Sequence, residues 1–364
     1  MSSPAKNLWR LLGASAAIML AAAALNFVVD PLQLFRPSRL LPPMYSDDVR
    51  MQNAGLIRSQ DFDTVFMGTS LAIHFRQSDI DRVLGVRSLK LTMQGSSSRE
   101  QAFVLEEALK QRRPRRIVWA MDDFIFCDAA EIDSDIYLPA DIYRRNAKGV
   151  AGYLFSGAMA RESALLVLGA VPWLAPAVGR IAKFAIADVD DINTLARATD
   201  VGALYNAKNA MASFVRITDP ARAKYLGEGY GYESELRNFE RDAAGLIARH
   251  PDVQFDIYFP PYSILQWVAM RDASPETLRI VTDLTDHIAR RLVQFPNVRL
   301  FDFRAIEEIT HDLGNYSDVI HHSPAIDQKV LSMLAKSERV VERAAPTAPL
   351  ERLKAQIGAY RVER

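Results

Sequence analysis

Short apolar runs alternate with longer amphipathic segments over most of the chain. Five runs are rich in β-branched and aromatic residues and are bounded by charged residues, Gly or Pro, which is typical of buried β-strands: residues 64–67, 88–91, 117–121, 255–259 and 298–303. Strands that alternate with helices indicate parallel strands joined by right-handed crossovers. The pattern therefore predicts an α/β fold, a five-stranded parallel sheet in a three-layer α/β/α domain.

Apolar positions spaced three to four residues apart predict the intervening helices, over residues 48–59, 78–84, 102–112, 233–249, 275–292 and 324–336. Ser98 and Gln101 are expected to form a capping box for the third of these helices. Pro275 and Pro324 suit the first position of the last two. The tail, residues 344–364, is expected to be weakly structured or a short surface helix.

The N-terminal segment has the pattern of a membrane anchor. Lys6 and Arg10 precede an uncharged run of about nineteen residues, 11–29, long enough to cross a bilayer as a helix. Positive charge before the run predicts that the N-terminus stays in the cytoplasm. The alternative is a signal peptide cleaved at the alanines 22–24. Because the apolar run continues past them, we expect a single-pass anchor in the inner (cytoplasmic) membrane, with the main domain extracytoplasmic (periplasmic).

The remaining segments suggest a discontinuous domain. Residues 1–30 are the predicted anchor, and 31–60 a proline-rich extended stalk with a lead-in helix. The α/β domain is expected over 61–126 and 232–343, interrupted by a helical insertion at 127–231 and followed by the tail.

One part of the insertion, residues 163–179, carries no charge and is interrupted by Pro172 and Pro176. A second membrane crossing there would separate the C-terminal strands from the first ones and split the sheet. The segment is therefore expected to be a buried hairpin or a helix pair resting on the membrane surface.

Composition narrows the function classes. Lys+Arg and Asp+Glu balance at 44 each, so no overall positive charge favours nucleic acid. The single cysteine, Cys127, and six scattered histidines exclude a disulfide framework and the Cys/His spacing of zinc sites. No phosphate-loop, dinucleotide or HExxH pattern is present. We therefore expect neither a metal nor a cofactor.

Polar residues follow the predicted strands, where parallel sheets bind their ligands. They are Ser70 and Gly95 after the first two strands, Asp122 and Asp123 after the third, Tyr262 after the fourth, and Asp318, His321 and His322 after the fifth. Asp318 precedes His321 by three residues, which lets its carboxylate hold Nδ1 while Nε2 faces a serine. Ser96 is the rival nucleophile, and His74 is expected at the surface or on the pocket wall.

These residues resemble a known family in type and order. Gly68-Thr69-Ser70, Gly95 and Asp318-Val-Ile-His321 are similar to the motifs of the SGNH (GDSL-type) hydrolase superfamily, over residues 61–336 apart from the insertion. With its anchor, the chain more closely resembles the membrane-anchored extracytoplasmic members, of the teichoic-acid D-alanylation and polysaccharide O-acetylation type. The resemblance implies Ser70 as nucleophile, His321 as base and Asp318 as its orienter. It also implies an oxyanion hole made by the backbone N–H groups of Ser70 and Gly95.

Asp122 departs from the family pattern, in which many members place an asparagine after the third strand. An ionised aspartate accepts hydrogen bonds and repels an oxyanion. Three interpretations follow: two backbone donors suffice, Asp122 has a structural role, or activity is reduced or lost. Asp122, Tyr262 and His322 are expected to line the pocket or adjoin it.

The leading prediction is an anchored serine esterase or O-acyltransferase acting on a cell-envelope glycan or a lipid-linked ester. A second is a catalytically silent accessory or glycan-binding protein of an envelope acylation or polysaccharide system, docking on an integral-membrane acyltransferase. A third is a lipid-facing lipase or thioesterase, suggested by the apolar segment 163–179.

Overall fold

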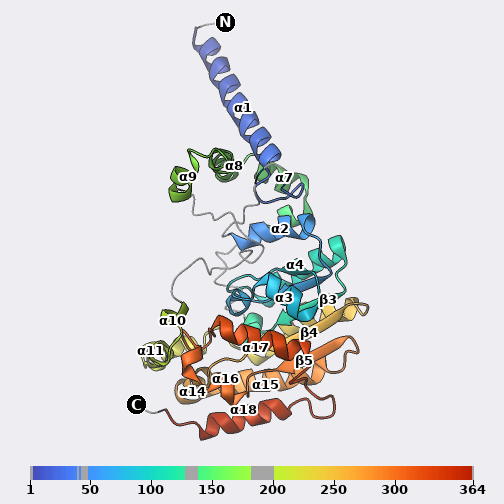
Figure 1. The fold of residues 1–364 in the computed structure, drawn as a ribbon, viewed down its shortest axis with the longest axis vertical. Helices are drawn as coiled ribbons and strands as arrows, with labels where there is room; N and C mark the ends of the chain where they lie inside the picture. The colour runs from blue at the N-terminus through green and yellow to red at the C-terminus, as the bar shows by residue number, and fades with distance from the viewer. Residues whose placement is uncertain (1–2, 39–40, 42–47, 128–137, 182–200, 363–364) are drawn as a thin grey trace. The chain divides into compact units, whose positions relative to one another are not determined.

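The computed structural model describes residues 3–38, 41, 48–127, 138–181 and 201–362 (Figure 1). The chain divides into two compact units. The helical unit comprises Met1–Asp61 and Leu138–Ile192, and the α/β unit comprises Phe62–Tyr137 and Asn193–Arg364. The predicted insertion, residues 127–231, is thus shared between the two units.

A five-stranded parallel sheet forms the centre of the α/β unit. Its strands are β1 (Thr64–Met67), β2 (Ser88–Lys90), β3 (Arg116–Ala120), β4 (Gln254–Phe259) and β5 (Val298–Asp302). Their order is β2-β1-β3-β4-β5, and every neighbouring pair is parallel. All five predicted strands are confirmed to within one residue at each end. Since β1 lies inside the sheet, the segment after it is flanked by those that follow β2 and β3.

Side chains alternate across the strands, and one set packs beneath two helices. Phe66, Val118, Tyr258 and Phe301 share a buried cluster with residues from α3 (Gln77–Leu84) and α17 (Pro324–Ala335). Helices α3 and α17 also contact each other. The apolar side chains of α17, the closing helix, therefore pack into the core, as their spacing predicts.

The other helices of the α/β unit complete its core. The α-helices are α4 (Ser98–Arg112), α10 (Val201–Leu204), α11 (Ala207–Thr218), α12 (Tyr232–Asn238), α13 (Gly245–Arg249), α14 (Ile264–Ala273), α15 (Pro275–Leu292), α16 (Glu307–Thr310) and α18 (Ala348–Ala359). A π-helical turn, η5 (Phe239–Ala244), joins α12 to α13. Short 3-10 helices are η1 (Ser70–Ala72), η2 (Asp123–Phe126), η4 (Ala223–Leu226) and η6 (Leu313–Asn315).

One local prediction needs correction. The capping box of α4 is formed by Ser97 and Glu100, not by Ser98 and Gln101. Gln101 instead accepts a hydrogen bond of 2.6 Å from Trp119 Nε1, which takes its side chain into the core. Of the two alternatives for the tail, the short surface helix forms: α18 buries its apolar face against α14, a helix the sequence pattern did not predict.

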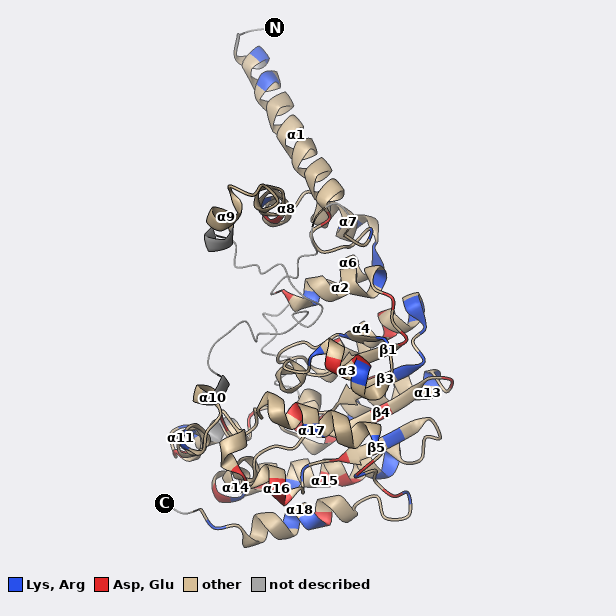
Figure 2. Ribbon diagram, in the orientation of Figure 1, with Lys and Arg blue, Asp and Glu red and all other residues tan. Residues whose placement is uncertain are grey.

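Six helices make up the described part of the helical unit: α1 (Ser3–Val29), α2 (Val49–Ser59), α6 (Ala140–Arg144), α7 (Ala147–Leu154), α8 (Gly157–Gly169) and α9 (Ala175–Ile181). Helix α1 is long and apolar enough to cross a membrane, the one such helix among the described residues. Its charged residues lie only at the N-terminal end, drawn blue in Figure 2.

The connection after α1 differs from the expected extended stalk. The carboxylate of Asp30 accepts hydrogen bonds of 2.8 to 3.0 Å from the backbone N–H groups of residues 34–36. Leu32 is buried, and a Cβ on Gly55 of α2 would lie only 1.7 Å from the Leu32 carbonyl oxygen. Residues 31–38 therefore form a tight turn packed on α2, and most of the remaining predicted stalk lies outside the described residues.

Candidate active site

Three residues proposed from the sequence come together at the carboxyl edge of the sheet. Ser70 begins η1, directly after β1, and its Oγ lies 2.9 Å from His321 Nε2. His321 Nδ1 lies 2.6 Å from Asp318 Oδ2. Serine, imidazole and carboxylate thus form one hydrogen-bonded relay between the loops that follow β1 and β5.

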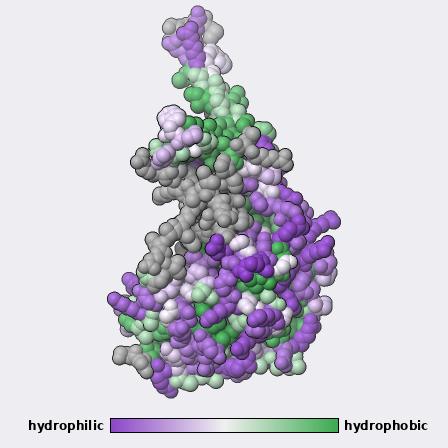
Figure 3. Space-filling view, in the orientation of Figure 1, coloured by the Kyte–Doolittle hydropathy of each residue, from purple (hydrophilic) through white to green (hydrophobic). Residues whose placement is uncertain are grey.

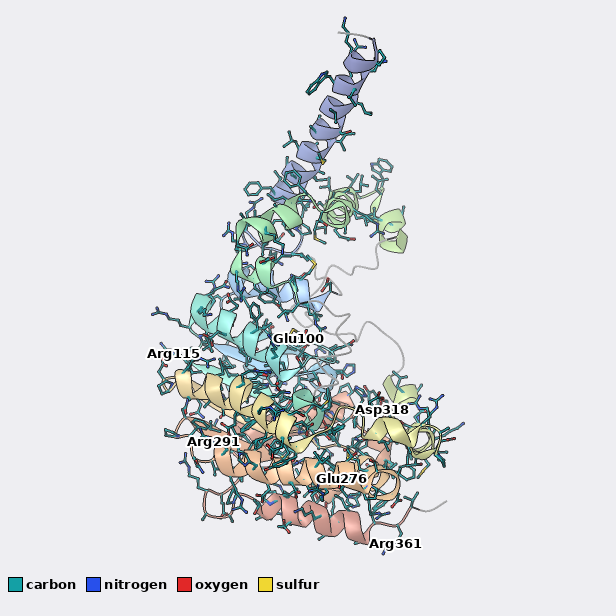
Figure 4. The ribbon with its side chains drawn as sticks, turned by 180° about the vertical axis from the view of Figure 1, so that it is seen from behind. Glu100, Arg115, Glu276, Arg291, Asp318 and Arg361 are labelled. Atoms are coloured by element: carbon teal, nitrogen blue, oxygen red, sulfur yellow. The ribbon has the colours of Figure 1, made fainter. Side chains whose placement is uncertain are left out.

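The loop around Asp318, labelled in Figure 4, fixes the carboxylate and the ring together. Asp318 Oδ1 accepts hydrogen bonds from the backbone N–H groups of Ile320, at 2.8 Å, and His321, at 2.7 Å. Burial opposes ionisation of Asp318, but these bonds and the His321 side chain outweigh it and lower the pKa of the carboxyl. Burial likewise opposes protonation of His321, but Asp318 outweighs it and raises the pKa of the imidazole. The pair is therefore suited to accept and hold a proton at Nε2.

Close packing behind Ser70 requires glycine at position 68. A Cβ there would lie 2.6 Å from the Ala72 Cβ and 3.0 Å from the Ala120 Cβ. The Gly68 carbonyl also accepts a 2.9 Å hydrogen bond from Met93 N, which holds the segment after β2 beside that after β1. This contact brings the loop that carries Gly95 to the same edge as Ser70.

Two backbone donors at this edge are unengaged. Among the described residues, neither the Ser70 N–H nor the Gly95 N–H donates a hydrogen bond. Gly95 has a φ of +56°, in the left-handed region that favours glycine, and a Cβ there would meet nothing within 4 Å. Neither N–H group is therefore committed to a partner among the described residues.

Asp122 accepts hydrogen bonds with both carboxylate oxygens. Thr69 Oγ1 donates to Oδ2 at 2.5 Å, and the Tyr262 hydroxyl lies 2.9 Å from Oδ1. Burial of the side chain raises the pKa of Asp122 to about 7, although both hydrogen bonds oppose that rise. Asp122 thus ties together the loops after β1, β3 and β4, next to the nucleophile candidate.

Tyr262 is buried and faces inward. Its hydroxyl also lies 3.0 Å from Asp123 Oδ1, and burial raises the pKa of Asp123 to about 6. Asp122, Asp123, Tyr262, Trp267 and Arg304 line part of a cavity of about 20 Å³. That volume suits a single water molecule, so this cavity is too small for a substrate.

His322 belongs to a separate buried pair. Its Nδ1 lies 3.1 Å from Asp327 Oδ1, with both side chains almost fully buried. Burial raises the pKa of Asp327, and the neighbouring His322 opposes that rise. His322 is therefore a neighbour of the relay rather than a member of it.

Two further residues lie near the relay: His74, which the sequence placed at the surface or on the pocket wall, and Tyr205, which it did not single out. Burial, followed by the charges of His322, Lys90 and His321, lowers the pKa of His74 to about 4, so its imidazole is neutral at physiological pH. The ring stands edge-on to Tyr205, with 6.4 Å between centroids. His74 follows Ser70 by four residues, which was the available signal; Tyr205 comes from the predicted insertion and had none.

No family model matches the chain, and no curated protein matches it.

Proposed function

We propose that this chain is a membrane-anchored extracytoplasmic serine esterase or O-acyltransferase of the SGNH type. Its substrate would be an ester-bearing cell-envelope glycan or a lipid-linked ester. The observation that carries the proposal is the relay Ser70–His321–Asp318 at the carboxyl edge of the parallel sheet. In this proposal the sheet and its helices form a three-layer SGNH-like domain, and α1 spans the inner membrane with Lys6 and Arg10 on the cytoplasmic side.

The proposed reaction is acyl transfer through Ser70. Ser70 Oγ attacks the ester carbonyl carbon while His321 Nε2 takes its proton, and Asp318 stabilises the imidazolium. The backbone N–H groups of Ser70 and Gly95 bind the oxyanion. His321 then gives its proton to the departing alcohol, which leaves an acyl group on Ser70. Water or a sugar hydroxyl, deprotonated by His321, attacks that acyl group. The bond to Ser70 Oγ breaks, and His321 returns the proton to Oγ, which restores the serine.

Covalent labelling tests the proposal. The full chain, purified in detergent, should react with a fluorophosphonate, and Ser70→Ala should abolish the reaction. Ser96→Ala is the matched control, because the buried Ser96 Oγ already donates to Met93 O at 2.8 Å and accepts from Gln101 Nε2 at 2.9 Å. Labelling that survives Ser70→Ala would overturn the assignment. Comparing the turnover rates of acetyl esters and long-chain acyl esters then distinguishes an envelope esterase from a lipase.

Asp122 favours a second function, a silent accessory protein that binds glycan or docks on an integral-membrane acyltransferase. Above pH 7 its buried carboxylate is ionised beside Ser70 and opposes negative charge on a neighbouring oxygen. In this case the wild type would not label, and Ser70→Ala and His321→Ala would both restore envelope acylation in cells. Asp122→Asn would then produce labelling where the wild type has none.

A further inference from the structure

Helix α8 and the connection between α8 and α9 expose large apolar side chains. Val167 is 41% exposed, Leu168 43%, and Trp173, in the connection between the helices, 78%. They lie in the uncharged segment 163–179. The expected buried hairpin is therefore not what forms, because the apolar surface faces outward. Apolar side chains gathered on a surface mark an interaction site.

Hydrogen bonds tie α8 to the end of the anchor helix. The side chain of Asn26, fully buried in the last turns of α1, donates to the carbonyl oxygens of Leu154 at 2.9 Å and Ser156 at 3.2 Å. It also accepts a hydrogen bond of 2.9 Å from Ser163 Oγ of α8. Figure 1 shows α8 beside the C-terminal end of α1. The position of α8 along α1 is thereby fixed.

The pattern of exposed and buried residues along α1 shows where α8 lies relative to the stretch that would cross the membrane. Residues 11–20 of α1 are exposed throughout, whereas Ala23 and Asn26 are buried. In Figure 3 the exposed stretch is green below a purple, charged N-terminal end. Since a helix of about twenty residues crosses a bilayer, the last turns of a spanning α1 lie at the far membrane boundary. Helices α8 and α9 then lie at that boundary too.

We propose that α8 and α9 form a second membrane contact, with Val167, Leu168 and Trp173 inserted at the boundary between headgroups and acyl chains. The partner is the lipid surface of the outer leaflet. Tryptophan suits this depth because its ring is apolar and its N–H is polar. The helices do not cross, because α8 has 13 residues and α9 has 7, against about twenty for a span. This inference rests on the membrane-spanning α1 of the proposed function.

Nitroxide labels on the full chain test the depth. The chain carries Cys127→Ala, is reconstituted in phosphatidylcholine vesicles, and receives one cysteine at a time, at Leu168, Trp173, Met19 or Val215. Met19, 55% exposed on α1, reports the anchor. Val215, 60% exposed on α11 of the α/β unit, is the matched apolar control. Collisions with oxygen report lipid, and collisions with a nickel chelate report water.

The expected result is Met19 deep in lipid, Leu168 and Trp173 at the shallow boundary, and Val215 in water. Leu168 and Trp173 in water with Met19 in lipid would overturn the inference and leave the anchor standing. Labels at Leu168 and Trp173 shielded from both reagents would mean that a second copy or a protein covers the helices, which also overturns it. Met19 in water would overturn the anchor itself and the inference with it.

Discussion

The two units of the chain differ in how many apolar side chains they expose. In the α/β unit apolar side chains form the core, while the relay side chains of Asp318 and His321 stay 28% and 34% exposed. The helical unit buries some apolar side chains, Leu56 and Tyr153 among them, but exposes many others. Among the described residues, every exposed large apolar side chain except Leu204, Val215 and Val340 lies in the helical unit.

This contrast is what the proposed membrane anchoring requires of the two units. Burying apolar surface from water contributes about 25 cal/mol per Å², so a unit in water gains by hiding such side chains. In lipid that gain disappears, and polar groups must find partners within the protein. Asn26 meets that requirement, because it is fully buried and hydrogen-bonded at the end of α1. The comparison thus supports assigning chemistry to one unit and membrane attachment to the other.

Asp318→Asn tests the chemical side of the comparison and has the largest expected effect. The amide can hold the wrong tautomer of His321, and we expect kcat for a small acyl ester to fall about 10⁴-fold. Because the pKa of His321 is raised above 6.5, wild-type kcat/KM should fall as the pH drops through a value above 6.5. Without the Asp318 carboxylate, burial lowers the pKa of His321 and only the smaller effect of the Asp122 charge opposes it, so the acid limb of any residual activity should move to lower pH.

Asp312→Asn is the matched control. Asp312 lies in the same loop region and caps η6 through a 3.1 Å hydrogen bond from Gly314 N, outside the relay. The Asp312→Asn variant should keep an esterase rate and a pH profile close to those of the wild type. Equal losses in Asp312→Asn and Asp318→Asn would mean that loop folding, and not the orientation of His321, limits the rate.

The strands could be predicted because each is a short apolar run with clear boundaries. Helix α14 could not, because it begins soon after Pro260-Pro261 and buries Trp267, Val268, Ala269 and Met270, so no amphipathic period is visible. The α4 cap was misplaced by one residue because Ser97 and Ser98 have the same chemistry. Only the packing of Gln101 against Trp119 decides between them.

The contacts of the candidate site also divide into those that the sequence suggests and those that appear only in the fold. The short spacing of Asp318 and His321 fixes their contact locally, so the sequence suffices to suggest it. The approach of Tyr205 to His74 depends on how a segment over a hundred residues away folds back, which no local pattern encodes. Asp122 was expected near the site, but its two hydrogen-bond partners come from separate loops and appear only in the fold.

Gly68→Ala tests how tightly the α/β unit is packed behind Ser70. The added methyl would meet the Ala72 and Ala120 methyl groups at 2.6 and 3.0 Å. Overpacking of this kind costs roughly 1–3 kcal/mol in the free energy of unfolding, and the shift of η1 should also slow turnover. Gly152→Ala in α7 is the control, since its Cβ would meet nothing within 4 Å. It should be neutral or stabilising by up to about 1 kcal/mol. Thermal unfolding of both variants, with esterase rates, checks the pair, and a neutral Gly68→Ala would contradict the packing described here.

Asn26→Leu tests the helical unit and has the smallest expected effect on the esterase rate. Leucine removes three hydrogen bonds between α1 and the α7–α8 segment and leaves their buried partners unsatisfied, at a cost of roughly 1–3 kcal/mol. Hydrogen exchange on the reconstituted full chain should show faster exchange in α8, by about tenfold or more. Asn209→Leu is the control, because the exposed hydrogen bonds of Asn209 in α11 can be replaced by water. If the units are independent, Asn26→Leu leaves exchange in β1 and β3 and the esterase rate unchanged. Faster exchange in those strands would show that the anchor region stabilises the catalytic unit, and the division of labour between them would fail.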